Sequence, residues 1–196
     1  MDRIRLWHTL RLCSIRGANE RAEYLKKHHV LKSVGRHCSF MPRKVPLYPN
    51  LIKLGDYVNI SSNVSFFTHD GVHNVLGKQN EVLPKELKDH KFDESIGCIE
   101  IGNHVFIAAN VAIGYNTKIG DNVVVTAGSV ITNDIPSNSV VRGNPAKVIC
   151  TLTQYLAMKA VKKTYPAELD HRIGQYVSKE LEDWLWEEFN KSREKK

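Results

Sequence analysis

The feature that most constrains the fold of this chain is a six-residue repeat that begins at residue 101. The sequence there divides into IGNHVF, IAANVA, IGYNTK, IGDNVV, VTAGSV and ITNDIP. Each unit opens with an aliphatic residue, and a second compact residue stands four positions later. The openers are Ile101, Ile107, Ile113, Ile119, Val125 and Ile131, and the compact residues are Val105, Val111, Thr117, Val123, Ser129 and Ile135. A period of six is neither the 3.6 of a helix nor the alternation of a long strand.

The period fits very short strands joined by tight corners, with one large and one compact side chain of each hexad facing inward. Three hexads then form one triangular coil of 18 residues, and stacked coils bury a continuous aliphatic column. The small residue after each opener, such as Gly102, is expected to relieve the corner through the backbone freedom of glycine. A β-sandwich with accidental spacing is the alternative, which six consecutive in-register hexads disfavour. Weaker copies of the repeat start at Val34 and Leu54, so we predict a parallel β-helix over residues 34–149.

The ends and one internal segment depart from the repeat. Residues 1–33 carry helix formers, including ANERAEYLKKHH, and residues 150–196 form a second helical segment. Its apolar residues have helical spacing, and we expect them to pack against the β-helix or a neighbouring subunit rather than a foreign partner. They are Leu181, Trp184, Leu185 and Phe189. Residues 72–98 form a polar insertion, and an insertion of that length in a compact domain is usually functional or mobile.

Charge, cysteines and hydropathy limit the class of protein. The net charge of +7 favours an anionic partner but does not choose among nucleic acid, acidic lipid and a phosphorylated small molecule. The four cysteines are scattered without a Cys-x-x-Cys pair, which indicates reduced thiols. No apolar run approaches the ~20 residues that span a bilayer, and the first residues are too charged for a signal peptide. We therefore expect a cytoplasmic protein with no membrane span.

The hexads, followed by GSVITNDIPSNSVVRGNPAKVI at residues 128–149, resemble the hexapeptide-repeat acyltransferases. The most similar branch contains the maltose, galactoside and capsular-polysaccharide O-acetyltransferases. The resemblance covers residues 34–149, and GNPAKVI is its most specific part. It implies a left-handed β-helix, acetyl-CoA as acyl donor, and a homotrimer with active sites between subunits. The handedness follows from the resemblance, because parallel crossovers are normally right-handed.

The resemblance also implies that His69, in FFTHDG just before the insertion, is the general base. An acceptor hydroxyl attacks a thioester only as its proton is removed, and imidazole suits that task at neutral pH. Transfer is then direct, and no cysteine has to be a nucleophile. His73 and His104 are expected at the surface. Asp70 could orient the imidazole, but neighbouring strand residues point to opposite faces, so the orienting residue stays unassigned.

For the donor, the resemblance implies that acetyl-CoA lies along the outer groove of the last coils. The matching positions are Ala109, Ala127, Thr132, Asn133 and Lys147. The alanines equally suit tight corners, and both interpretations can hold together. Three positions depart from the family pattern. Asn133 stands where many relatives have lysine, GYN at 114–116 replaces a common Pro-Gly turn, and Arg142 replaces a small residue and could compensate with its charge.

We therefore expect acetyl transfer to a hydroxyl of a sugar, in a surface or capsular polysaccharide pathway. An amine acceptor, on an amino sugar or antibiotic, remains an alternative. A zinc carbonic anhydrase on the same fold would need three histidine ligands; the spacing of His69 and His73 does not resemble that family, and we expect no metal. A non-catalytic scaffold would not need His69 or the terminal motif. Nucleic-acid binding rests on net charge alone and is not expected. The sequence does not identify the acceptor.

Overall fold

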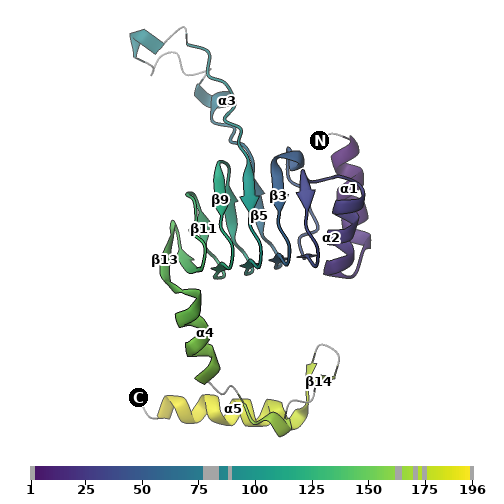
Figure 1. Ribbon diagram of the computed structural model, residues 1–196, viewed down its shortest axis with the longest axis vertical. Helices are drawn as coiled ribbons and strands as arrows, with labels where there is room; N and C mark the ends of the chain where they lie inside the picture. Colours follow the sequence, from purple (N-terminus) through teal and green to yellow (C-terminus); the bar gives the residue numbers. More distant parts are fainter. Residues whose placement is uncertain are drawn as a thin grey trace. The chain divides into compact units, whose positions relative to one another are not determined.

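The computed structural model describes residues 3–76, 84–87, 90–161, 165–169, 172–173 and 176–194. The chain divides into two compact units, Met1–Tyr155 and Leu156–Lys196. The first unit is a parallel β-helix preceded by two helices, and the second is mostly helical (Figure 1). The predicted fold class, a β-helix with helices at both ends, is confirmed.

Three sheets form the faces of the β-helix, and the chain visits them in turn. Sheet A contains β1 (Ser33–Val34), β3 (Ile52–Leu54), β6 (Ile99–Ile101) and β9 (Thr117–Ile119). Sheet B contains β2 (Ser39–Phe40), β4 (Asn59–Ile60), β7 (Phe106–Ile107), β10 (Val124–Val125), β12 (Ser139–Gly143) and β13 (Ala146–Thr151). Sheet C contains β5 (Ser65–Phe67), β8 (Ala112–Gly114) and β11 (Val130–Ile131). All neighbours are parallel except β12 and β13, which form a terminal hairpin.

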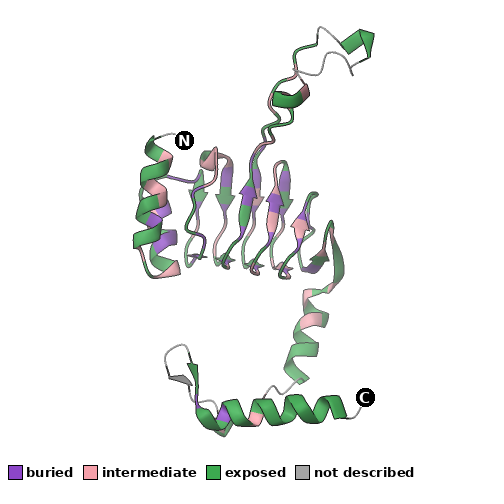
Figure 2. Ribbon diagram, turned by 180° about the vertical axis from the view of Figure 1, so that it is seen from behind, coloured by how far each residue is buried: buried purple, intermediate pink, exposed green. Residues whose placement is uncertain are grey.

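The strand register stacks equivalent positions of successive coils. Ile101 pairs with Ile119, and Ile113 pairs with Ile131, each one 18-residue coil apart. All six predicted openers and all six compact residues are buried, and the apolar ones form one core together with earlier copies such as Ile60. Figure 2 shows this buried material along the β-helix strands. Each fully buried isoleucine contributes about 1.5–3 kcal/mol relative to an exposed one, so the column is the main source of stability.

The corners show why glycine follows the opener, and the reason differs from the expected one. The φ angle of Gly102 is not positive, so backbone freedom is not required there. A Cβ on Gly102 would lie 2.9 Å from the carbonyl carbon of Gly120 and 3.0 Å from the amide nitrogen of Asp121. The left-handed residues stand two positions later, with φ of +54° at His104, +60° at Asn110, +55° at Asn116 and +57° at Asn122. Asparagine tolerates this conformation better than most residues.

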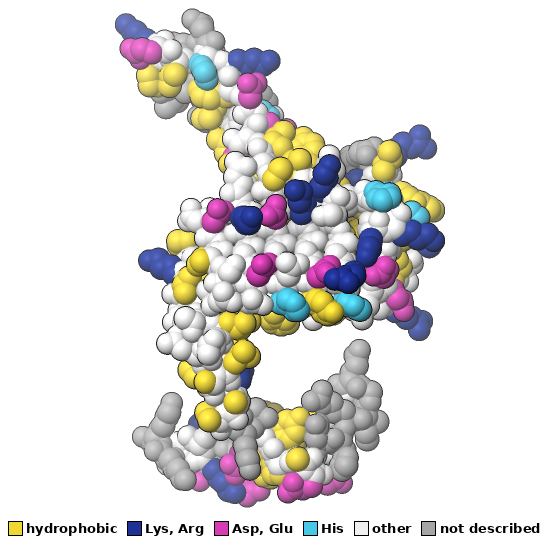
Figure 3. All heavy atoms as spheres, viewed as in Figure 1, with side chains coloured by type: hydrophobic (Ala, Val, Ile, Leu, Met, Phe, Trp, Pro, Cys, Tyr) yellow, Lys and Arg dark blue, Asp and Glu magenta, His cyan; other side chains and the backbone are white. Residues whose placement is uncertain are grey.

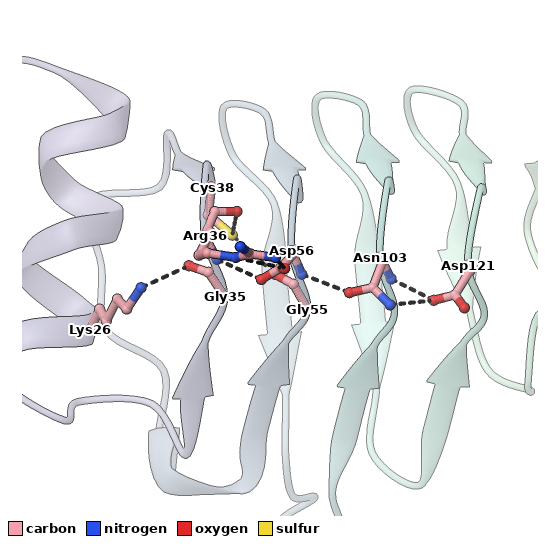
Figure 4. A network of polar contacts seen from close by, with 8 residues as sticks. All are labelled: Lys26, Gly35, Arg36, Cys38, Gly55, Asp56, Asn103 and Asp121. Atoms are coloured by element: carbon pink, nitrogen blue, oxygen red, sulfur yellow. Dashed lines mark hydrogen bonds and ion pairs between the residues drawn. The ribbon is translucent and has the colours of Figure 1, made fainter.

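A polar ladder holds the corners between sheets A and B together (Figure 4). The backbone N–H of Arg36 donates to Asp56 at 2.7 Å, that of Asp56 to Asn103 at 2.9 Å, and that of Asn103 to Asp121 at 2.6 Å. Each corner amide thus finds its acceptor on the next coil, where the strand ladder offers none. The Arg36 guanidinium also donates to Asp56 at 2.7 and 3.0 Å, which lowers the pKa of that carboxyl.

Ion pairs cross the outer surface of sheet A. Glu100 accepts from Lys118 at 2.9 Å and lies 3.7 Å from Lys53 on the other side. Hydrogen bonding from Lys118 lowers the pKa of Glu100. Figure 3 shows charged side chains of both signs interspersed over the β-helix. Exposed pairs of this kind contribute little to stability, so this surface is a solvated one rather than a second core.

Two helices close the N-terminal end of the column, α1 (Arg3–Ser14) and α2 (Ala18–Lys27). Helix α2 packs on β1 and β2. Leu12 and Leu25 join the core from this side. Arg21 is also buried, where its Nε donates to the Phe40 carbonyl at 2.8 Å and its Nη1 to the Ile15 carbonyl at 2.7 Å. The guanidinium therefore satisfies carbonyl groups that the end of a β-helix would otherwise leave unpaired.

The predicted insertion leaves the β-helix after β5 and returns at β6 (Figure 1). Its two arms pair at the base, where the Gly97 N–H donates to the Thr68 carbonyl at 2.9 Å and the Asp70 N–H to the Ser95 carbonyl at 3.0 Å. We call this pairing the neck of the insertion. Beyond it lie α3 (His73–Leu76) and a 3-10 turn at Lys85–Leu87. The remainder of the predicted 72–98 segment, residues 77–83 and 88–89, lies outside the described residues.

Helix α4 (Leu152–Val161) leads from the first unit into the second. The second unit continues with a 3-10 turn at Ala167–Leu169, the hairpin of β14 (Arg172–Ile173) and β15 (Tyr176–Val177), and α5 (Lys179–Glu194). The predicted apolar stripe lies on α5, where Leu181 is buried and Leu185 is exposed. Its packing against the β-helix or another subunit stays a prediction. Of the helices described, none has both the length and the apolar character needed to cross a membrane.

The close stacking of coils gives a test of the corner glycines. Gly102→Ala should lower the free energy of unfolding by about 1–3 kcal/mol, because the added methyl group meets backbone that cannot move aside. Gly71→Ala is the matched control, since its Cβ would meet only the Asn74 amide at 3.5 Å. Urea unfolding of both variants measures the difference. Equal midpoints would show that the coils can separate at Gly102 without cost.

Candidate active site

His69 lies at the neck of the insertion, where β5 ends. It stands opposite Ile96 of the returning arm and is half-buried. The edge of its ring contacts the Tyr48 ring, with centroids 5.5 Å apart and planes at 78°. Its Nδ1 is buried and has no hydrogen-bond partner. A buried polar atom without a partner is rare, and a catalytic role is one of the explanations for it.

Residues 47 and 48 bind both arms of the neck. The Tyr48 hydroxyl donates to Glu94 Oε2 at 2.9 Å, and this hydrogen bond raises the pKa of Tyr48. On the outgoing arm, the Thr68 hydroxyl donates to the Leu47 carbonyl. His69 is therefore fixed between the first coil and the insertion, although its position depends on residues far apart in the chain. Neither Tyr48 nor Glu94 belongs to a sequence motif, so sequence analysis could not have identified either residue.

Asp70 is held by the next coil. The Tyr115 hydroxyl donates to Asp70 Oδ2 at 2.6 Å, and the Val72 N–H donates to Oδ1 at 3.2 Å. The Tyr115 hydrogen bond lowers the pKa of Asp70 and raises that of Tyr115. No hydrogen bond joins Asp70 to His69, so Asp70 fixes the neck rather than the imidazole. The sequence signal for this contact was the departure from the family pattern at GYN, which contains Tyr115.

A groove of about 900 Å³ opens beside His69. One wall is the outer surface of β5, where the Phe67 ring is 51% exposed. The other wall is the irregular segment 41–47 after β2, together with Arg5 of α1 and Arg21 of α2. The groove has both an apolar wall and polar groups, as small-molecule sites usually do. Sequence analysis assigned only His69 of its lining, because segment 41–47 lies outside the regular hexads.

The predicted donor residues lie along the last coils. Ala109 and Ala127 occupy equivalent corners of two coils, where the Gly128 N–H donates to the Ala109 carbonyl at 3.0 Å. Thr132 and Asn133 are exposed at the corner after β11, and the Asn133 amide donates to Thr132 Oγ1 at 3.2 Å. Lys147 is exposed on β13. The structure thus places all five predicted residues on consecutive corners and the terminal hairpin.

Within one chain His69 and the alanines lie on opposite edges of sheet C. The alanine corners lead into β8 and β11, whereas His69 follows the last residue of β5. A three-residue strand separates the two edges, a distance of about 10 Å. Thr132 and Asn133 share the His69 edge, two coils further along. A single chain therefore places Thr132 and Asn133 on the edge of His69 but does not bring the alanines to the imidazole.

The other candidate groups are dispersed. His104 is exposed and stacks on Tyr57 with centroids 4.7 Å apart, as expected for a surface position. His73 is half-buried at the start of α3, and its Nδ1 lacks a partner. The cysteines Cys13, Cys38, Cys98 and Cys150 are free thiols. In the part of the chain that the structure describes, no three His, Cys, Asp or Glu side chains are grouped to hold a metal ion.

Comparison with known proteins identifies the family. A sequence model of the bacterial transferase hexapeptide family (six repeats) matches residues 98–133. The protein CapG of Staphylococcus aureus is 34% identical over 141 residues, which cover 70% of this chain and 76% of CapG. This chain belongs to the hexapeptide-repeat acyltransferase family. The resemblance stated from the sequence is confirmed.

Two further relatives fit this assignment. The galactoside O-acetyltransferase of Escherichia coli (strain K12) is 39% identical over 99 residues, or 50% of this chain and 43% of that enzyme. The match therefore spans less than half the length of that relative. The crystal structure of a hexapeptide-repeat acetyltransferase from Vibrio cholerae aligns with a TM-score of 0.56 at 22% identity, covering 76% of this chain and 89% of the other. This second likeness shows the shared fold of the acyltransferases.

Proposed function

We propose that this acyltransferase moves an acetyl group from acetyl-CoA to a hydroxyl of a sugar or polysaccharide precursor, with His69 as general base. The observation that carries the proposal is the place of His69 in the lining of an open groove, with its buried Nδ1 free of any hydrogen-bond partner. Family membership supports the reaction class. The name of the Escherichia coli galactoside O-acetyltransferase supports a saccharide acceptor.

His69 performs the proton transfers of this mechanism. An acceptor hydroxyl in the groove donates a hydrogen bond to the imidazole, which removes the proton as the oxygen attacks the thioester carbonyl. The new C–O bond forms, the C–S bond breaks, and the imidazolium returns its proton to the departing sulfur. Charge on the imidazolium is transient, so no permanent acidic partner is needed. Transfer is direct, and the four thiols take no part.

The donor residues fit a coenzyme A thioester. The methyl side chains of Ala109 and Ala127 leave the backbone of two successive corners accessible to a pantetheine arm. Arg142 and Lys147 face each other across the terminal hairpin, and both are exposed. Two adjacent cations suit the phosphates of a nucleotide, and Arg142 supplies the charge that Asn133 does not. Bound there, acetyl-CoA would supply the activated acetyl group.

We further propose that the protein is a homotrimer, because the donor corners of one subunit must approach the His69 edge of another. An exposed aromatic side chain supports a covered surface, since Phe106 is 43% exposed on the outer face of sheet B. Light scattering should give three times the chain mass of 22.3 kDa. A monomeric mass at micromolar concentration would contradict the trimer.

Replacing His69 tests the general base. His69→Ala should lower kcat by about 10²–10⁴-fold, the usual contribution of a positioned acid–base group, while KM for acetyl-CoA stays nearly constant. Thiol release, measured over a panel that pairs sugars with amino sugars, reports turnover and separates hydroxyl from amine acceptors.

His104→Ala is the control for this experiment, because His104 is exposed at a corner on a different edge of the β-helix. Its turnover should match that of the wild type. Thermal unfolding of both variants excludes a loss of fold as the cause. A folded His69→Ala protein with near-normal turnover would refute the role of His69.

Replacing Lys147 tests the donor site. Lys147→Ala should raise KM for acetyl-CoA about tenfold, the value of one charge-assisted hydrogen bond, with little change in kcat. The phosphates are remote from the reacting thioester, so Lys147 binds ground and transition states equally. Lys53→Ala removes an equally exposed lysine from sheet A and should leave KM unchanged. A large fall in kcat at constant KM would place Lys147 elsewhere in the reaction.

A further inference from the structure

Four cationic side chains line the groove beside His69. They are Arg5 of α1, Arg21 of α2, and Arg43 and Lys44 of the segment after β2. Among the described residues, no Asp or Glu lines the same groove. Like charges gathered without acidic partners repel one another, so such a cluster generates a strong positive potential in a concave site. This groove is therefore unlike sheet A, where the charges are paired.

The four cations differ in how far the protein itself uses them. Arg21 is buried, and its Nε and Nη1 donate to backbone carbonyl groups. Burial and, to a smaller extent, the charge of Arg43 lower the pKa of Arg21. Arg43 is partly engaged, since its Nη1 donates to the Cys13 carbonyl at 2.7 Å. Arg21 and Arg43 thus help to form the wall of the groove. The Nε and Nη2 atoms of Arg43 donate no hydrogen bond to the described residues and can bind a ligand.

Arg5 and Lys44 are the unused members of the cluster. The Nε of Arg5 is buried and has no hydrogen-bond partner. Lys44 is exposed and forms no ion pair or hydrogen bond with any described residue. Arg5 and Lys44, together with the partly engaged Arg43, can therefore bind an anion. Arginine binds carboxylate and phosphate oxygens through paired N–H donors.

Apolar side chains complete the groove. Phe67 and Met41 are 51% and 40% exposed and line the same groove as the cations and His69. A sugar ring has an apolar face that can cover such side chains, and its hydroxyls remain free at the rim. The arrangement thus offers contacts for the ring and for an acidic group of one ligand, with the imidazole within the same groove.

We propose that the acceptor is an anionic saccharide, whose carboxylate or phosphate is bound by Arg5, Arg43 and Lys44 while its ring lies over Phe67. This inference rests on the proposed acetyl transfer, because it is the hydroxyl of this ligand that reaches His69. Sugar acids and sugar phosphates share the required chemistry. The cluster stands apart from the donor residues, which occupy the last coils and the terminal hairpin.

Matched sugars test the inference. Galacturonic acid and galactose 1-phosphate are compared with methyl galactoside, and the corresponding gluco compounds are compared with methyl glucoside. Binding is measured by saturation-transfer NMR and titration without donor, and turnover is measured by thiol release with acetyl-CoA. At least one anionic sugar should bind or react about tenfold better than its neutral counterpart, as one charge-assisted hydrogen bond predicts. The two anionic members distinguish carboxylate from phosphate.

Variants assign the preference to the groove. Arg5→Gln and Lys44→Met should each reduce this preference, whereas Lys32→Met, which removes an exposed lysine outside the groove, should not. Lys44 is exposed and forms no hydrogen bond or ion pair with any described residue, so its variant should fold normally. Affinity for acetyl-CoA should be unchanged in Arg5→Gln and Lys44→Met. A loss of donor affinity in these variants would instead place the nucleotide phosphates in this groove and overturn the inference.

The remaining outcomes separate the two proposals. Anionic sugars that bind through Arg5 and Lys44 without being acetylated would support the groove and refute the reaction. Efficient acetylation of neutral and anionic sugars alike, unaffected by Lys44→Met, would support the reaction and refute the anionic acceptor. Binding of no anionic sugar above its neutral counterpart would also refute it.

Discussion

The structure depends on the stacking of inward-facing aliphatic side chains at an 18-residue register. A single coil has no core of its own, so Ile101 is buried because Leu54 of the preceding coil and Ile119 of the next coil lie beside it. This constraint requires close contact at the corners, which excludes a side chain at Gly102. It also leaves two open ends. Helix α2 with its buried Arg21 closes the first, and the hairpin of β12 and β13 forms the last.

A scaffold of this kind is rigid along its strands and places chemical groups at its corners. His69 illustrates the consequence, since it follows a three-residue strand and is fixed by the neck of the insertion rather than by a flexible loop. The hydrogen bond from Tyr115 to Asp70 joins that neck to the next coil. A catalytic base benefits from this arrangement, because small displacements of a reacting group cost large factors in rate.

The structure shows where the positively charged side chains lie. On sheet A the cations are matched by acids, as in the contact between Lys118 and Glu100. Among the described residues, the cations without an acidic partner include Arg5 and Lys44 of the groove beside the first coils, and Arg142 and Lys147 of the hairpin at the last. In the proposed reaction these places serve two different anions, the acceptor and the nucleotide of the donor. Net charge alone could not distinguish one broad basic surface from two such sites.

The sequence by itself determined the repeat and the inward positions from Ile101 to Ile131, because these follow from a local period. It gave the wrong reason for Gly102, since close approach between coils appears only when coils are stacked. Only the tertiary structure determined the hydrogen-bond partner of Asp70 and the residues that line the groove with Arg5. Tyr115 is 45 residues from Asp70, and Arg5 reaches the groove through a helix outside the repeat. Such contacts join segments whose spacing has no period, so only the folded coils bring them together.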